Sequence, residues 1–288
     1  MNVHSLTAAA SANAGDLIAL SGGFDPSATA APGARIENQG TIQAGTGGFV
    51  YLVAPEVENG ASGVIVSPEG EIRLAAGATV YLTDRPDGLG LAVEYTAPAT
   101  GSAINLGQLV ADGGLVRMRG ELVRQGGLVE ANAVREKGGR IELYAEDSLR
   151  LESGGELRLT TGDPSTGAAA GVATLGSGGS ASIAGSQTIA GRGVVKLSAN
   201  ESISLEDGAR VGLDAQGGDA TLALHAGQDV LFGTGAQIVE SAASPATGGF
   251  DVQLVAGATD LSVEGLGRGT SASPTAGGVY LSGATGAP

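Results

Sequence analysis

A Gly-Gly pair followed by a short run of alternating apolar residues recurs along the chain and limits the folds that it can adopt. The pairs begin at Gly47, Gly113, Gly126, Gly138, Gly217, Gly248 and Gly277. Each leads into roughly four to six residues of period-two alternation, the pattern of a half-buried β-strand, while glycine permits the sharp or left-handed backbone of a turn. One strand-and-turn unit that returns at near-regular spacing is typical of repeat architectures.

A leucine that closes the repeated strand shows the length of the repeat. It can be followed from Leu143 to Leu197, Leu224, Leu254 and Leu281, and the first of these steps is twice as long as the second, so it spans two repeats. Strands this short are unstable as isolated hairpins, but stacked in register they bury one face continuously. Because connections between parallel strands are right-handed, we predict an all-β, right-handed parallel β-helix, or β-solenoid. Coils of about 20 to 30 residues would give an elongated rod of roughly 10–13 coils with loops extruded at corners.

Composition agrees with a thin core and restricts the partners. Of 288 residues, 51 are Gly, 10 are Pro and 3% are aromatic, without the glycine at every third position that collagen requires. The formal net charge of -15 repels nucleic acid, so no nucleic-acid partner is expected. With no Cys, disulfides and thiolate metal sites are excluded. His4 and His225 are isolated in sequence, and we expect no metal and no cofactor.

The whole chain, residues 1–288, is expected to form a single β-solenoid segment, because no linker is long enough to define a second domain. Residues 1–34 are expected to form an irregular N-terminal edge. Stretches rich in Gly, Ser, Thr, Ala and Pro at 83–98, 162–179, 241–248 and 265–277 are predicted to be loops. Within the first of them, Asp84 to Gly88 is interpreted as a turn shaped by Pro and Gly and not as a calcium site.

Several short sequence segments resemble the repeats of a known protein family. The runs Ile36–Ala44 (IENQGTIQA), Gly70–Gly77 (GEIRLAAG) and Ile104–Ala111 (INLGQLVA) are similar to the repeats of filamentous haemagglutinin-like exoproteins of two-partner secretion systems, a family of large adhesins and contact-dependent inhibition proteins. The resemblance implies a right-handed β-helix that is secreted or displayed on the bacterial cell surface. It also implies export through an outer-membrane transporter, and attachment to a host or bacterial surface receptor or glycan, or a stalk that holds a distal effector.

One departure from the family concerns secretion. The Asn-Pro-Asn-Gly motif of the family's secretion domain is missing, and no signal peptide is recognisable. Recognition by the transporter is therefore expected to reside in a region outside this chain, and the chain is expected to be a fragment of a much larger exoprotein.

Three asparagines, Asn38, Asn59 and Asn105, stand close to glycines after alternating runs. We predict that their side chains satisfy backbone groups at turns, as Asn does in many turns. A ligand-binding edge is the alternative.

Basic residues gather between residues 117 and 158. Arg117, Arg119, Arg124 and Arg140 are candidates for a basic face that contacts glycans. Glutamates are interleaved with them, so the alternative is a solvated face of mixed charge, with opposite charges on neighbouring coils.

We predict a non-catalytic adhesin or structural stalk segment, because acidic residues are spread singly along the repeats and not clustered as acid–base catalysis requires. A self-associating extracellular filament is the alternative, since a solenoid exposes unpaired strand edges at its ends. A polysaccharide lyase is a further alternative.

Overall fold

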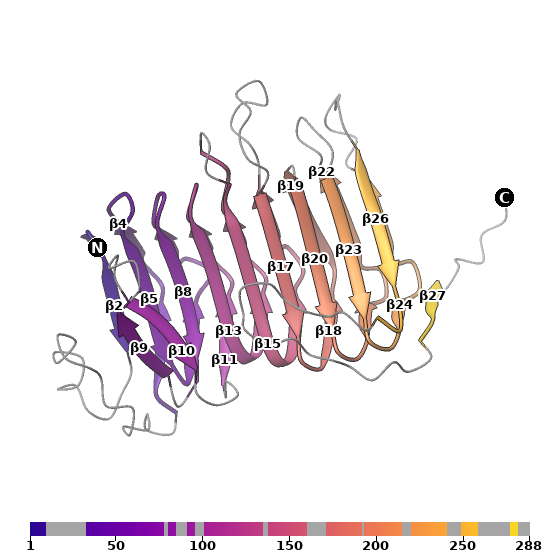
Figure 1. Ribbon diagram of the computed structural model, residues 1–288, viewed down its shortest axis with the longest axis horizontal. Coiled ribbons are helices and arrows are strands. Elements are labelled where there is room, and N and C mark those ends of the chain that lie inside the picture. The colour runs from indigo at the N-terminus through magenta and orange to yellow at the C-terminus, as the bar shows by residue number, and fades with distance from the viewer. Residues whose placement is uncertain are drawn as a thin grey trace.

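The computed structural model describes residues 1–9, 33–77, 80–84, 91–95, 101–134, 138–159, 171–191, 193–214, 220–240, 249–258 and 277–281. These residues form strands joined by turns, and no helix occurs among them. Figure 1 shows the strands side by side in chain order, from indigo at the N-terminal end to yellow at the other, so that the chain winds into a rod. The predicted parallel β-helix is therefore confirmed.

The rod has three faces of stacked parallel strands. The third face is a sheet of its own, and the first and second are parts of one larger sheet. On the first face, each strand pairs with the next one in this order: β2 (Leu6–Ala9), β5 (Phe49–Ala54), β8 (Glu71–Ala76), β13 (Leu115–Gln125), β15 (Arg140–Leu151), β17 (Gly171–Ser177), β20 (Gly193–Ala199), β23 (Ala220–Ala226) and β26 (Phe250–Val255).

The second face follows the first in each coil. Strands β13 and β15 run across the corner and contribute their second halves to it. Its other strands are β3 (Arg35–Asn38), β6 (Glu56–Asn59), β11 (Ser102–Asn105), β18 (Ser180–Ile183), β21 (Ile203–Leu205), β24 (Val230–Phe232) and β27 (Val279–Leu281).

The third face closes each coil. It consists of β1 (Asn2–Val3), β4 (Thr41–Ala44), β7 (Val64–Val66), β12 (Gln108–Val110), β14 (Leu128–Glu130), β16 (Glu156–Leu159), β19 (Ser186–Gly191), β22 (Arg210–Asp214) and β25 (Gln237–Glu240). We name each coil by its strands, for example the β13–β14 coil and the β15–β16 coil.

The core is a set of columns of apolar side chains that run along the rod. Alternate residues of a strand point inward, and parallel pairing in register places each one over its equivalent in the next coil. On the first face Leu143, Leu175, Leu197 and Leu224 form such a column, and each is at most 2% exposed. Burying one such side chain contributes about 1.5 to 3 kcal/mol, so the columns and not large aromatics stabilise the rod.

The leucine series predicted from the sequence needs two corrections. Leu175, which the long first step of the series skipped, occupies the missing coil of the column. Leu281 pairs with Phe232 on the second face, so it does not belong to the column. Equal spacing along the chain does not distinguish one face from another, because leucines such as Leu205 and Leu281 also occupy strands of the second face.

Each face has nine strands among the described residues. The coils differ in length, and one of the two longest steps on the first face leads from Ile72 on β8 to its register partner Val116 on β13. This step holds an antiparallel hairpin, β9 (Val80–Asp84) and β10 (Leu91–Tyr95), which lengthens one coil without adding another. Figure 1 draws this hairpin across the rod near its N-terminal end.

Three of the predicted irregular stretches contain regular strands. Within 1–34, β1 and β2 already pair with the following coil. Within 83–98, β10 is part of the hairpin, and within 162–179, β17 pairs on both sides. Small residues and Gly lower strand propensity in these stretches, but pairing on a stacked sheet overrides it. The predicted loop 241–248, and 265–276 of the other, lie outside the described residues, as does most of the turn expected at Asp84 to Gly88.

Candidate functional site

A groove of about 360 Å³ lies at the corner where the third face turns into the first, and it crosses four coils. The corner is built from tight turns, in which Gly48, Gly70 and Gly114 donate backbone hydrogen bonds of 2.9, 3.1 and 2.8 Å to the carbonyl three residues earlier. Their own carbonyls accept from the first strand residue of the following coil, at 2.9 to 3.0 Å. The corner is therefore one continuous hydrogen-bonded stack.

Glycine is required at this corner because the coils approach closely. A Cβ at Gly70 would overlap the carbonyl oxygen of Gly48, and a Cβ at Gly114 would overlap that of Gly70. The preceding turn residue adopts a left-handed backbone at Gly47 and, with φ of 52°, at Glu69. The repeated Gly-Gly signature of the sequence thus reflects the close stacking of corners, and the groove is hollow because its floor has no side chains.

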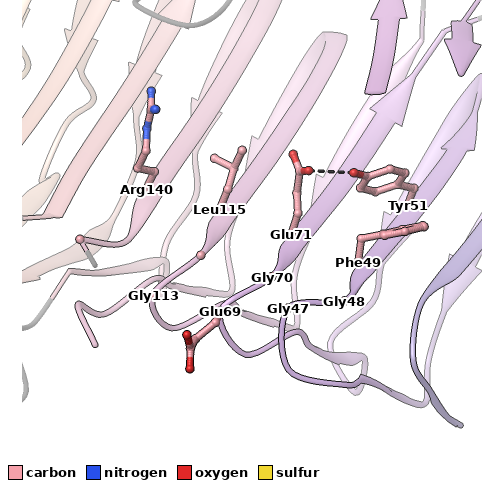
Figure 2. A pocket seen from close by; sticks show the side chains of 12 residues that line it. Gly47, Gly48, Phe49, Tyr51, Glu69, Gly70, Glu71, Gly113, Leu115 and Arg140 are labelled. Carbon is pink, nitrogen blue, oxygen red and sulfur yellow. Dashed lines mark hydrogen bonds between the residues drawn. The ribbon is translucent and has the colours of Figure 1, made fainter. Parts of the chain in front are cut away.

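Four outward side chains form a row along the groove, one from each of four neighbouring coils. Phe49, Glu71, Leu115 and Arg140 are successive register partners on β5, β8, β13 and β15. Strands in a sheet are about 4.8 Å apart, so the row is about 14 Å long. Figure 2 shows Glu71, Leu115 and Arg140 pointing the same way along the first face, whereas Glu69 points away from them.

An aromatic pair forms one end of the groove. The rings of Phe49 and Tyr51 stack with centroids 4.6 Å apart at an interplanar angle of 28°. The guanidinium of Arg73 lies 5.3 Å from the centroid of Tyr51, and the Tyr51 hydroxyl donates to Glu71 Oε2 at 2.7 Å. Arg73 Nε also donates to Glu71. Because Tyr51, Glu71 and Arg73 are 1, 5 and 8% exposed, their polar groups bond to one another and hold the aromatic pair in place.

Arg140 forms the other end of the groove and is the accessible cation there. Its side chain is 53% exposed and donates one hydrogen bond of 2.9 Å from Nη2 to Glu142 Oε1. A guanidinium has five N–H donors, so most of those of Arg140 are available to a ligand. The groove therefore offers a partly exposed aromatic ring, an apolar side chain and a cation on a rigid floor.

The structure places the four arginines of the predicted basic face on β13 and β15, and each pairs with a glutamate. Arg117 Nε donates to Glu142 at 2.6 Å, and Arg119 Nη2 donates to Glu146 at 2.7 Å. The remaining pairs are Arg124 with Glu152 and Arg140 with Glu142. This is the mixed-charge arrangement that interleaved acids favour.

The structure places Asn38, Asn59 and Asn105 inside the rod, at the end of the second face. Asn38 Nδ2 donates to Asn59 Oδ1 at 2.8 Å, and Asn59 Nδ2 donates to Asn105 Oδ1 at 2.9 Å. Asn105 Nδ2 continues to Gln125 Oε1 at 2.9 Å, and Gln125 ends the series on the carbonyl of Gly127. We call these four residues the amide ladder. They are at most 9% exposed and line the interior, so they do not face the groove.

The amide ladder also satisfies backbone groups at its turns. Asn38 Nδ2 donates to the carbonyl of Gly40 at 3.0 Å, and Asn59 Nδ2 lies 3.3 Å from that of Gly63. Gln125 is a member that sequence reasoning missed, because it is one methylene longer and is not followed by the same phrase. Its register with Asn105 would have revealed it once the pairing was known.

Phe49, Tyr51 and Glu71 are groove residues that sequence reasoning also missed. Phe49 and Tyr51 were recognised as members of an alternating strand, but nothing in the chain order places Glu71 beside them. Their proximity depends on the register between β5 and β8, which pairs Phe49 with Glu71.

Two arginines outside the groove, Arg150 and Arg158, have raised pKa values. The hydrogen bond that Arg150 donates to Glu206 raises the pKa of Arg150, and the hydrogen bonds that Arg158 donates to Glu156 and Glu130 raise the pKa of Arg158. Both guanidiniums therefore stay charged wherever a free arginine would.

The described residues hold no group of three or more His, Cys, Asp or Glu side chains placed to bind a metal ion. In the groove, the Glu71 carboxylate accepts hydrogen bonds from Tyr51 and Arg73. No helix of the described part is long and apolar enough to cross a membrane.

No protein-family model matches this chain, and no curated protein matches it either. The resemblance to filamentous haemagglutinin-like exoproteins remains a prediction that rests on the short phrases of the sequence.

Proposed function

We propose that this chain is a rod-like segment of a secreted or surface-exposed bacterial adhesin or stalk, which attaches to a receptor or glycan or holds a distal effector. The observation that carries the proposal is the groove: Phe49 and Arg140 are presented on a hydrogen-bonded glycine floor that spans four coils. Rigid display of an aromatic ring and a cation in a concave site is typical of binding surfaces.

The rest of the surface is consistent with a rod that works in solution outside a cell. Its net charge of -15 opposes aggregation, and its arginines on the first face are paired with glutamates, so non-specific attraction to anionic polymers is weak. Export would use an outer-membrane transporter of two-partner secretion, which would recognise a region outside this chain. This partner and the bacterial surface location follow from the family resemblance alone.

Binding of the purified rod to glycan arrays and to whole cells tests the proposal. Phe49→Ala removes the aromatic ring, and Arg140→Gln removes the cation, so both variants are expected to lose binding while keeping the circular dichroism of the unaltered chain. Val172→Ala is the matched control, because Val172 is the next register partner after Arg140, is 40% exposed and does not line the groove.

The outcomes separate the two roles. Binding that is lost in both groove variants and kept in the control supports an adhesin. Absence of any binding by the unaltered rod contradicts adhesion and leaves the stalk role, and binding that survives both groove substitutions shows that the groove is not the contact site.

A self-associating filament is a second candidate, and one observation favours it. In the last described coil, Val252, Val279 and Leu281 occupy inward positions, yet they are 42, 42 and 65% exposed. A second copy stacked end to end would bury them and pair the open strands. Sedimentation over a range of concentrations tests this candidate, since a Leu281→Asp variant should weaken any association, and a strict monomer at high concentration contradicts it.

A further inference from the structure

Ion pairs between coils are concentrated on one coil of the rod. Where both partners are described residues, every ion pair that joins two coils includes a residue of the β15–β16 coil. The other ion pairs between described residues lie within one strand or within the β15–β16 coil itself. The joining pairs are Arg117 with Glu142, Arg119 with Glu146, Arg124 with Glu152, Glu130 with Arg158, and Arg150 with Glu206.

Four of these pairs lie at one interface, that between the β13–β14 and β15–β16 coils, and they are spread over all three faces. The pairs of Arg117 and Arg119 lie on the first face, that of Arg124 lies at the end of the second, and that of Glu130 lies on the third. Glu142 is 2% exposed and both partners of the Arg119 pair are 12% exposed, so salt screens these first-face pairs less than the pairs of Arg124 and Arg158, whose side chains are 46 and 41% exposed.

The second face shows that the arrangement links more than two coils. Arg124 and Arg150 are direct register partners and would repel each other. Glu152 lies between them, 2.6 Å from Arg124 Nη2 and 3.8 Å from Arg150 Nε. Arg150 Nη2 then reaches Glu206 at 3.0 Å, two coils further along.

The interior changes at the same interface. The amide ladder ends at Gln125, and its register partner Leu151 begins an aliphatic column that continues through Ile183 and Leu205. Strands β13 and β15 are also the longest among the described residues, with 11 and 12 residues, because each continues across the corner between two faces, where their register shifts between Gly120 and Leu122. Two stretches with different interiors therefore meet where backbone pairing and ion pairs are densest.

We propose that the interface between the β13–β14 and β15–β16 coils is a lock that stops unravelling as it spreads along the rod. In a solenoid each coil contacts only its neighbours, so unfolding proceeds coil by coil and halts at the interface with the largest interaction free energy. The lock confines opening of the β17 to β26 coils to that side and leaves the amide-ladder coils closed. This inference concerns the mechanics of the rod and does not depend on what the groove binds.

Hydrogen exchange of the full chain, read by mass spectrometry, tests the lock. In low salt, amide protection is expected to rise sharply between β17 and β13. Raising the salt from about 0.1 to 1 M shortens the Debye length from about 10 to 3 Å and weakens chiefly the half-exposed pairs of Arg124 and Arg158 at this interface. The rise in amide protection between β17 and β13 should then become smaller, and exchange in β13 and β8 should accelerate by at least about tenfold. The reason is that opening of the β17 to β26 coils would then extend into the coils of β13 and β8.

Variants separate the lock from general salt effects. Arg119→Glu is expected to flatten the step in low salt, and the charge-swapped double variant Arg119→Glu with Glu146→Arg is expected to restore it. Arg35→Gln is the matched control, because it removes an ion pair within one strand. The lock is overturned if protection shows no step in the unaltered chain, if the step is insensitive to salt, or if Arg35→Gln flattens it as much as Arg119→Glu does.

Discussion

Replacing Asn59 by leucine tests whether the amide ladder acts as a connected unit. Leucine fits the site, because the same position of the β15–β16 coil is occupied by Leu151 in the aliphatic column. The substitution removes the carbonyl acceptor and both N–H donors of a side-chain amide from a fully buried position. Any loss of stability therefore reports on hydrogen bonding and not on lost volume.

The structure sets the size of the effect. Without Asn59, the Oδ1 atom of Asn105 loses its 2.9 Å donor at a site that is 0% exposed. The carbonyl of Gly63 loses a contact of 3.3 Å but keeps its 2.8 Å hydrogen bond from the Gln108 N–H, and Asn38 Nδ2 keeps its bond to Gly40. A buried polar group left without a partner costs about 1 to 3 kcal/mol, so the orphaned Oδ1 of Asn105 predicts a loss of about 1 to 3 kcal/mol.

Urea unfolding followed by circular dichroism measures this loss as a lower midpoint with an unchanged m-value. Gln39→Ala is the control, since Gln39 is an exposed neighbour of the ladder and should change the free energy of unfolding by no more than about 0.5 kcal/mol. If Asn59→Leu proves as mild as the control, the ladder contributes no net stability and the reasoning fails.

Three further substitutions test other parts of the structure. Gly70→Ala should strongly weaken stacking of the groove corner, because the new Cβ overlaps a backbone carbonyl of the previous coil. Gly40→Ala is the control and should be nearly neutral, because its new Cβ meets no atom within 4 Å. Equal urea midpoints for the two variants would refute the close approach of the coils. Leu143→Ala should cost about 2 to 5 kcal/mol in the central column, measured by the same unfolding, and a loss below about 1 kcal/mol would show that the core collapses around the site. The raised pKa of Arg150 means that its stabilising contribution is present below the unfolded pKa and is lost only as pH rises through the still higher folded pKa. Arg150→Lys should instead lose that contribution as pH rises through about 10.4, so identical alkaline unfolding profiles would contradict the pairing.

Much of the fold could be predicted from periodicity alone. Alternation specifies which side chains can face a common interior, and the Gly-Gly pairs mark the corners, so the parallel β-helix followed from the chain order. The lengths of the individual coils did not follow, because a hairpin such as that of β9 and β10 alternates like the coils and lengthens a step without adding a coil. The leucine spacing also assigned Leu281 to the wrong face, since spacing carries no information about faces.

The candidate site could be predicted only in part. Asparagine beside glycine indicates a turn, and the turn bonds of Asn38 and Asn59 are of that kind. The continuous ladder through Gln125 required the register of the second face. Predicting the groove would have required the register of the first face across four coils, because the stacking of these coils of unequal length brings Phe49 and Arg140 together.

The sequence by itself determined that the chain is a rod of stacked β-strands with a thin aliphatic interior. Local alternation and glycine corners are properties of neighbouring residues, and these are enough to specify a repeating unit. Only the tertiary structure decided which coils lie one above another, and so which charges pair, which amides join the ladder and which side chains line the groove. Those pairings depend on how many residues each coil contains. The number of residues in a coil follows from which strands stack in register, and no single repeat determines it.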